Sequence, residues 1–338
     1  MSPWRRKLYR RIHRLLHRRN MRHMEKVWPH LKMEPMPGGI NRVTWRGSRL
    51  FETLPWSDIK TWSKTYSRTL IITTGQSIKD EDLTDLSDTF VIGVNGAIAL
   101  QDTHPIKFDA YFIIDSSFVE KRYSLFKRVI DQRIPCFLAF NCVGQACDMA
   151  PELLKDARVF VVELANKRFN MPSLPPADFY HWAKNQNNIS VCDQFSQTND
   201  RVGFSLDPAA GFFDGATVAF WAVQTALYAR FSAVGILGMD LGTSTSVFRF
   251  YEDENDTLRS KLEKNFSQTI EPSFRLASRI YDEHKIGLYN LSLISRLSGD
   301  IIPKMRLADF MRLTSEQQRR SLSGLQSQQP LPVIASNV

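Results

Sequence analysis

The chain has 338 residues, enough for one large α/β domain with appendages or for two modest domains. Its composition, 43% hydrophobic and 23% charged, is ordinary for a soluble globular protein. No apolar run reaches the roughly 18 residues of a membrane span, and no secretory signal is expected because the N-terminus lacks an apolar region. The four cysteines form no CxxC pair, which favours thiols in a reducing cytoplasm over a zinc site built from three of them and a histidine.

The basic character is concentrated in the first 26 residues. They hold ten Lys and Arg side chains against Glu25 alone, and so carry the whole formal net charge of +9. Ser2 and Pro3 predict a helix start, followed by an apolar stripe at three-to-four spacing: Trp4, Leu8, Ile12, Leu15 and Leu16. The pattern predicts that residues 1–32 form an amphipathic helix on an anionic membrane surface. The side chains expected to bind the membrane are Trp4, Arg5, Arg6, Arg10, Arg11, Arg14 and Arg18.

This basic leader has three other interpretations: a nucleic-acid-binding segment, a mitochondrial transit peptide, or a helix that packs on its own domain. The membrane surface is favoured, and no nucleic-acid partner is expected, because no aromatic-basic platform accompanies the leader and the rest of the chain has no net charge. Residues 33–68 begin with a stretch rich in Pro and Gly, and are expected to be a linker or an irregular lead-in.

Residues 69–310 alternate short apolar strands with helices. The expected strands are Thr69–Thr74, Phe90–Asn95, Ala110–Asp115, Pro135–Phe140, Arg158–Val162, Ala233–Leu237 and Gly287–Asn290, and the expected helices include Phe118–Asp131, Thr217–Arg230 and Glu271–His284. This rhythm predicts an α/β, Rossmann-like domain with a mostly parallel sheet and helices on both faces. Within it, residues 163–202 are expected to be a lid or substrate loop. Residues 311–338 are expected to complete a helix and continue as a disordered tail.

Polar residues follow three successive strands of this expected sheet: Gly75, Gln76 and Ser77 after the first, Asn95 after the second, and Asp115 and Ser116 after the third. The carboxyl ends of parallel strands meet at one crevice, where open α/β sheets bind ligands. Each of these residues could instead cap the helix that follows it. Their coincidence on three strands favours a ligand site.

The segment from Gly203 to Gly242 combines a glycine-rich loop, a long apolar helix and a buried strand. Gly215 and Thr217 precede the helix, whose N-terminus could bind a phosphate through free N–H groups. The strand delivers Asp240 to the same crevice. The segment predicts an enzyme that handles a nucleotide or another phosphorylated ligand, with the Gly75 turn as the better phosphate candidate.

Several of these motifs resemble the bacterial glycosyltransferase-like family that shares a domain with archaeal 6-hydroxymethylpterin diphosphokinase. They are Thr74-Gly75-Gln76-Ser77, Gly215-Ala216-Thr217-Val218, Gln224 and Gly238-Met239-Asp240. The resemblance covers residues 69–309, and the architecture is similar to that of family-42 sialyltransferases, which use CMP-activated nonulosonic acids without a metal. It implies that Gly75, Gln76, Ser77 and Asn95 hold the nucleotide, that Asp115 and Ser116 contact the sugar nucleotide, and that Tyr251 binds the departing phosphate.

One departure from that family concerns the general base. The family has a histidine after the strand that ends in Gly-x-Asp, whereas this chain has none between His181 and His284. Asp240 or Glu252 would then have to accept the proton of the acceptor hydroxyl.

The resemblance predicts a glycosyltransferase of lipopolysaccharide or glycolipid synthesis, peripheral at the cytoplasmic face of a bacterial inner membrane. It would transfer a CMP-activated ulosonic acid, Kdo or sialic acid, to a lipid-linked acceptor, with no metal and no cofactor beyond the donor. The alternatives are a pterin-type diphosphokinase that uses ATP and Mg²⁺, with Asp115 and Asp240 as candidate metal ligands, and a non-catalytic protein that binds at the membrane surface.

Overall fold

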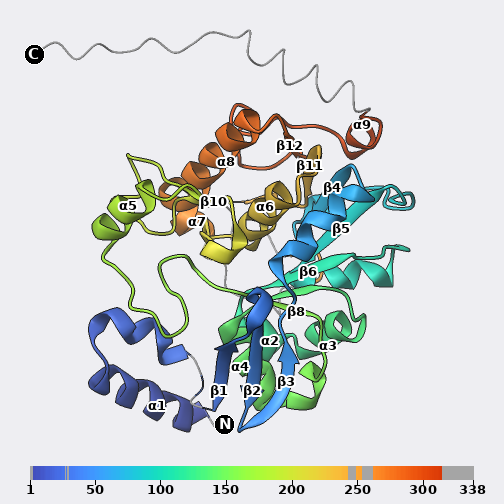
Figure 1. The fold of residues 1–338 in the computed structure, drawn as a ribbon. Coiled ribbons are helices and arrows are strands. Elements are labelled where there is room, and N and C mark those ends of the chain that lie inside the picture. The colour runs from blue at the N-terminus through green and yellow to red at the C-terminus, as the bar shows by residue number, and fades with distance from the viewer. Residues whose placement is uncertain (1–2, 27, 29, 243–248, 253–261, 314–338) are drawn as a thin grey trace, which may run out of the picture.

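A seven-stranded, wholly parallel sheet forms the centre of the computed structural model, which describes residues 3–26, 28, 30–242, 249–252 and 262–313 (Figure 1). The strand order is β12-β11-β4-β5-β6-β7-β8, and every neighbouring pair is parallel. The strands are β4 (Arg68–Ile72), β5 (Thr89–Val94), β6 (Ala110–Ile113), β7 (Cys136–Ala139), β8 (Val159–Val162), β11 (Ala233–Leu237) and β12 (Gly287–Asn290). All seven predicted strands are confirmed, with small shifts at their ends.

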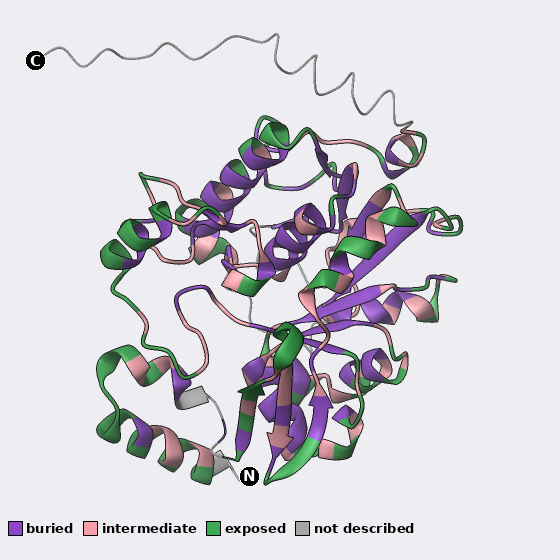
Figure 2. Cartoon of the chain, in the orientation of Figure 1, coloured by how far each residue is buried: buried purple, intermediate pink, exposed green. Residues whose placement is uncertain are grey.

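Helices cover both faces of this sheet, as predicted, because its strands are apolar on both sides. In β4, Ile71 belongs to one hydrophobic core, whereas Leu70 and Ile72 belong to the other. The first core is shared with α6 (Val218–Ala229) and α8 (Glu271–Glu283). The second is shared with α2 (Ser116–Lys121), α3 (Tyr123–Asp131) and α4 (Phe140–Met149). Figure 2 shows the buried residues concentrated in the sheet and on the inner sides of these helices.

The helix predicted over Phe118–Asp131 is instead two helices, α2 and α3, which meet at Arg122. Arg122 leaves the helical conformation, with φ −124° and ψ 43°. The break has no glycine or proline to announce it. The other two predicted helices, α6 and α8, are confirmed to within one residue at each end.

The segment expected to be a linker contains a separate three-stranded antiparallel sheet, β1 (Leu31–Pro35), β2 (Asn41–Trp45) and β3 (Ser48–Glu52). The glycines that suggested a linker are in the turns of this sheet. Gly47, for example, has φ +83° and follows Arg46 with φ +50°, and two residues with positive φ suit the two-residue hairpin between β2 and β3. Val43 and Phe51 are buried in the second core. This part of the chain is therefore a packed element rather than a linker.

The leader folds back onto the body as two pieces rather than one helix, α1 (Pro3–Leu16) and the 3-10 helix η1 (Arg19–Lys26). The predicted cap Ser2 lies outside the described residues. Arg6 donates to Gln145 Oε1 of α4 at 2.7 Å, which favours the interpretation that α1 packs on its own domain. The apolar stripe nevertheless faces outward, since Leu15 and Leu16 are 84% and 75% exposed.

The remaining elements lie at the periphery. Residues 163–202 contain α5 (Pro176–Lys184) and β9 (Ile189–Ser190), which pairs with β10 (Phe204–Ser205). α7 (Leu262–Asn265) precedes α8, and α9 (Leu307–Met311) follows β12. The predicted disordered tail falls on residues 314–338, outside the described residues. In the part of the chain that the structure describes, no helix is long and apolar enough to cross a membrane.

Candidate active site

The order of the strands reverses between β4 and β11, and this is where the candidate site lies. From β4 the chain continues to β5, β6, β7 and β8 on one side, and β11 then joins β4 on the other side. Such a switch point leaves a crevice at the carboxyl ends of the two strands. Gly75–Ser77 follow β4, and Gly238–Asp240 follow β11, so the structure brings together two of the segments singled out from the sequence.

Gly75 is required at this point because the two strand ends touch there. Its N–H donates to the carbonyl of Gly238 at 2.8 Å. A Cβ at Gly75 would lie 2.3 Å from that carbonyl oxygen and 2.4 Å from Oδ2 of Asp240. The Gly75 turn is thus held against the end of β11 with no room for a side chain.

Asp240 is the partner that fixes this turn. It is 6% exposed, and its Oδ2 accepts the backbone N–H of Ser77 at 3.0 Å while its Oδ1 accepts the Ser77 hydroxyl. The Ser292 hydroxyl lies 3.2 Å from the same hydroxyl. Both carboxylate oxygens are therefore engaged with the turn, which is a positioning arrangement. The catalytic role expected of Asp240 stays a prediction.

Two buried polar atoms next to this turn have no hydrogen-bond partner in the described part of the chain: Oδ1 of Asn95 and the hydroxyl of Tyr251. The ring of Tyr251 packs on Gly96, where a Cβ would lie 2.0 Å from it. Asn95 has φ +47°, and its carbonyl accepts the hydroxyl of Tyr111 at 2.7 Å. Burial raises the pKa of Tyr251, so that its hydroxyl stays a neutral donor. Unpaired buried polar groups are costly, and a ligand could satisfy these two.

Glu252 lies between two arginines and is closed to solvent. Its Oε1 is 2.8 Å from Arg249 Nη1 and 3.8 Å from Arg122 Nη2, and its side chain is 2% exposed. This ion-pair cluster ties the segment of Glu252 to the break between α2 and α3. An acceptor hydroxyl could not reach this carboxylate in the arrangement described, and the catalytic role expected of Glu252 also stays a prediction.

Sequence reasoning gave no role to either arginine of this cluster. Arg122 gave no signal at all, since its partner Glu252 is far along the chain. Two further hydrogen bonds hold the same segment to the Gly75 turn. Gln76 Nε2 donates to the carbonyl of Arg249 at 3.3 Å, and the N–H of Phe250 donates to the carbonyl of Thr74 at 3.1 Å.

Asp115 and Ser116 stand at the carboxyl end of β6. The Asp115 carboxylate caps α2, accepting the N–H of Ser117 at 2.9 Å and its hydroxyl at 2.7 Å. The helix-cap interpretation is confirmed for this residue. The hydroxyl of Ser116 accepts from Asn141 Nδ2 at 3.2 Å. Of the three carboxylates considered for chemistry, Asp115 is the one exposed to solvent.

Gly215 and Thr217 shape the start of α6. Gly215 has φ +48°, and the Thr217 hydroxyl oxygen accepts the N–H of Ala219 at 3.4 Å. Gln224 of the same helix is fully buried and accepts the N–H groups of Ser205 and Phe213. Within the described residues, the bonds of Gly215 and Thr217 stay between 201 and 220 and do not reach the Gly75 turn. The binding role expected of both stays a prediction.

A comparison with protein families identifies the family of this chain. The family model described as "3-deoxy-D-manno-octulosonic acid transferase WaaZ" matches residues 58–308. The chain belongs to this transferase family. It is therefore a member of a glycosyltransferase family, and the region that defines the family contains every predicted site residue from Gly75 to Tyr251 and Glu252. The leader and the three-stranded sheet precede the matched region.

Curated relatives carry the same description. A probable 3-deoxy-manno-octulosonic acid transferase of Escherichia coli K12 is 24% identical over 74% of this chain and 87% of its own length. A probable 3-deoxy-manno-octulosonic acid transferase of Salmonella typhimurium LT2 is 22% identical over 71% of this chain and 87% of its own length. Among solved structures, the α-2,3-sialyltransferase Cst-I of Campylobacter jejuni is similar, with a TM-score of 0.41, 13% identity and coverage of 72% of this chain and 81% of that one.

Proposed function

We propose that this protein transfers 3-deoxy-D-manno-octulosonic acid (Kdo) from a CMP-activated donor to a lipid-linked glycan, lipopolysaccharide or a related glycolipid. The reaction takes place at the cytoplasmic face of the inner membrane, to which the protein binds peripherally, and it uses no metal. The family assignment supports the Kdo donor, and the outward apolar stripe of α1 supports the membrane site.

The observation that carries the donor site is the pair of unpartnered buried atoms, Asn95 Oδ1 and the Tyr251 hydroxyl, beside the Gly75 turn. The turn is held in place against the end of β11, where nothing but glycine fits, and this fixes the backbone to which the phosphate would bind. In the proposal, Gly75, Gln76 and Ser77 hold the nucleotide, and the neutral hydroxyl of Tyr251 donates to the phosphate as it leaves. Donors fixed before the reaction stabilise the charge that develops on a leaving phosphate.

The proton of the acceptor hydroxyl requires a carboxylate that the acceptor can reach. Asp240 and Glu252 are both closed to solvent and engaged by Ser77 and by two arginines. Asp115 is exposed at the carboxyl end of β6, and its oxygens retain further lone pairs beyond the cap of α2. We therefore assign the proton acceptor to Asp115 and a positioning role to Asp240. General-base catalysis of this kind contributes about 10²- to 10⁴-fold.

The leader supplies the membrane contact in this proposal. Its apolar stripe lies outward on α1, where Trp4, Leu8 and Ile12 are exposed together with Leu15 and Leu16. The flanking arginines face anionic headgroups, at about 1 kcal/mol for each basic residue near the surface. Arg6, one of the predicted membrane contacts, is turned toward α4 instead.

The donor is tested by incubating the purified protein with an acceptor glycolipid and one of several donors. CMP release should occur with CMP-Kdo and should require the acceptor, whereas UDP- and GDP-sugars should be inert. Turnover of a UDP- or GDP-sugar with no reaction of any CMP-sugar would overturn the donor assignment. EDTA should leave the rate unchanged. Loss of activity in EDTA, together with consumption of ATP and a pterin, would instead favour the diphosphokinase. Failure of every nucleotide to raise the melting temperature would favour a non-catalytic binding protein.

A further inference from the structure

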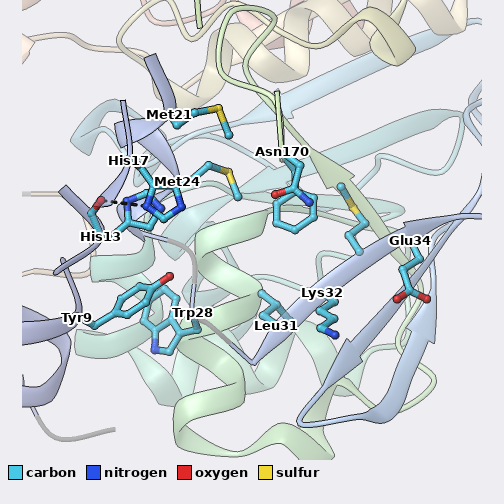
Figure 3. A pocket seen from close by; sticks show the side chains of 12 residues that line it. Tyr9, His13, His17, Met21, Met24, Trp28, Leu31, Lys32, Glu34 and Asn170 are labelled. Atoms are coloured by element: carbon cyan, nitrogen blue, oxygen red, sulfur yellow. Dashed lines mark hydrogen bonds between the residues drawn. The ribbon is translucent and has the colours of Figure 1, made fainter. Parts of the chain in front are cut away.

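A cavity of about 370 Å³ lies between the leader and the body of the protein, in a part of the molecule that the transfer reaction does not use (Figure 3). One side is formed by Tyr9 and His13 of α1, by His17 directly after this helix, and by Met21 and Met24 of η1. The other side is formed by Trp28, by β1 and by the loop at Asn170. The cavity is therefore completed only when the leader is docked.

Four polar groups that line the cavity have no hydrogen bond or ion pair to any other residue in the described part of the chain, and three of them, on His17, Lys32 and Asn170, are open to solvent at the mouth of the cavity. They are the Tyr9 hydroxyl, His17 Nε2, the Lys32 ammonium and the Asn170 amide. His17 is oriented by its other nitrogen, Nδ1, which lies 3.1 Å from the carbonyl of His13 and donates to it. Tyr9, Lys32 and Asn170 are donors, and His17 is a donor when protonated. One acidic side chain, Glu34, also lines the cavity.

The apolar part of the cavity and its position both point to a lipid. Met24 and Trp28 are buried in its wall. On α1, the cavity residues Tyr9 and His13 follow the stripe residues Leu8 and Ile12 by one position each. One position is about 100° around a helix, so the cavity flanks the face that would enter the membrane.

The cavity also lies at the same edge of the sheet as the candidate active site. The loop at Asn170 continues from Phe169, whose ring packs on Phe140 at 4.7 Å between centroids. Phe140 begins α4 directly after the carboxyl end of β7. β7 is separated from β4, which borders the crevice, by β5 and β6, which is three strand spacings or roughly 14 Å. A headgroup held in the cavity would thus anchor a lipid within reach of the crevice.

We propose that this cavity binds the phosphate monoester headgroup of an anionic membrane lipid. Lys32 supplies the positive charge, Tyr9 and Asn170 donate hydrogen bonds, His17 Nε2 adds a donor when it carries a proton, and Met24 and Trp28 contact the apolar part of the lipid next to the phosphate. The proposal extends the membrane docking of α1 and does not depend on which sugar is transferred. Phosphate contacts of this type are charge-assisted and stronger than neutral ones.

The test is titration of the full-length protein with three probes, followed by NMR of the ring of His17 and by fluorescence. The probes are dihexanoyl phosphatidic acid below its micelle concentration, inorganic phosphate, and dihexanoyl phosphatidylcholine. Phosphatidic acid should bind and change the chemical shifts of the His17 ring, and phosphate and phosphatidylcholine should each bind at least about tenfold more weakly. Equal binding of phosphatidylcholine, free phosphate binding as tightly as the lipid, or no binding of phosphatidic acid would each overturn the proposal.

Variants separate this site from general charge effects. Lys32→Ala should weaken the binding of phosphatidic acid about tenfold, and the matched control Lys155→Ala, which removes an exposed lysine elsewhere, should not. Asn170→Gly removes the amide without backbone strain, because residue 170 has φ +55°, and should weaken binding as well. Equal affinities for Lys32→Ala and Lys155→Ala would refute the site. Transfer to a soluble acceptor should be unchanged in Lys32→Ala, so a failure of the proposed reaction would be seen separately.

Discussion

Gly75→Ala tests the geometry of the candidate site most sharply, because the clash it creates is with backbone. The new Cβ would lie 2.3 Å from the Gly238 carbonyl oxygen, whereas real Cβ atoms stay beyond about 3.0 Å from other atoms. The turn must therefore retreat from the end of β11 by roughly 0.7 Å, which breaks or weakens its 2.8 Å bond to Gly238 and its two bonds to Asp240. Gly75 has φ −70°, so no strain of backbone conformation is added.

The magnitude follows from those bonds. A neutral hydrogen bond is worth about 0.5–1.5 kcal/mol and one to a charged group about 1.5–3 kcal/mol, so complete loss of all three bonds would cost about 3.5–7.5 kcal/mol. Because a small retreat of the turn weakens these bonds without removing all of them, the variant should lose roughly half of this, about 2–4 kcal/mol of unfolding free energy in urea. A displacement near 1 Å at a binding turn costs on the order of 10²-fold in rate, so kcat/KM for the donor should fall by about that factor.

The matched control is Gly299→Ala. At that position a Cβ would meet nothing closer than 3.9 Å and the backbone is not in the left-handed region. This variant should match the wild type in both measurements. If Gly75→Ala were as stable and as active as Gly299→Ala, the contact between the β4 turn and β11 would have no functional importance and the reasoning would be refuted.

Three further predictions concern the proton acceptor, the leader and the thiols. Asp115→Asn should lower kcat about 10²- to 10⁴-fold with little loss of stability. Asp240→Asn should mainly raise the donor KM and should cost about 1–3 kcal/mol of unfolding free energy, because its amide would face the N–H of Ser77. A larger fall in kcat for Asp240→Asn than for Asp115→Asn would return the base to Asp240. Leu15→Asp should weaken binding to anionic vesicles at least about tenfold without changing urea unfolding, since an exposed apolar side chain is lost, and the charge-matched Asn187→Asp should not. At pH 8 an alkylating reagent should label Cys192 first in the folded protein. Burial raises the pKa of the Cys136 and Cys147 thiols to about 12, which leaves almost no reactive thiolate at either. Rapid labelling of all four cysteines would contradict the packing described.

The sheet could be predicted because its strands are short, apolar on both faces and separated by helices, a pattern that local sequence carries in full. The three-stranded sheet could not, since its turn glycines, such as Gly47 with φ +83°, look the same in a linker. The break at Arg122 was invisible for a related reason: it is accompanied by a contact with Glu252, and no breaking residue marks it.

The candidate site divides in the same way. Rules for parallel sheets locate Gly75, Asn95 and Asp115 at one edge, and the structure places them at the carboxyl ends of β4, β5 and β6. What those rules cannot give is pairing between distant segments. Asp240 was expected to be free for catalysis, but its two oxygens are engaged by Ser77. The function of a carboxylate depends on its partners, and these are set by tertiary structure.

Mass spectrometry of the acceptor tests most directly whether this chain transfers an octulosonic acid to a lipid-linked glycan. After incubation with CMP-Kdo and lipopolysaccharide, the acceptor should gain the mass of one octulosonic acid residue, in step with CMP release and about 10²-fold more slowly with Gly75→Ala. An acceptor of unchanged mass while CMP-Kdo is intact, or an acceptor that gains a different sugar from another nucleotide donor, would contradict the account.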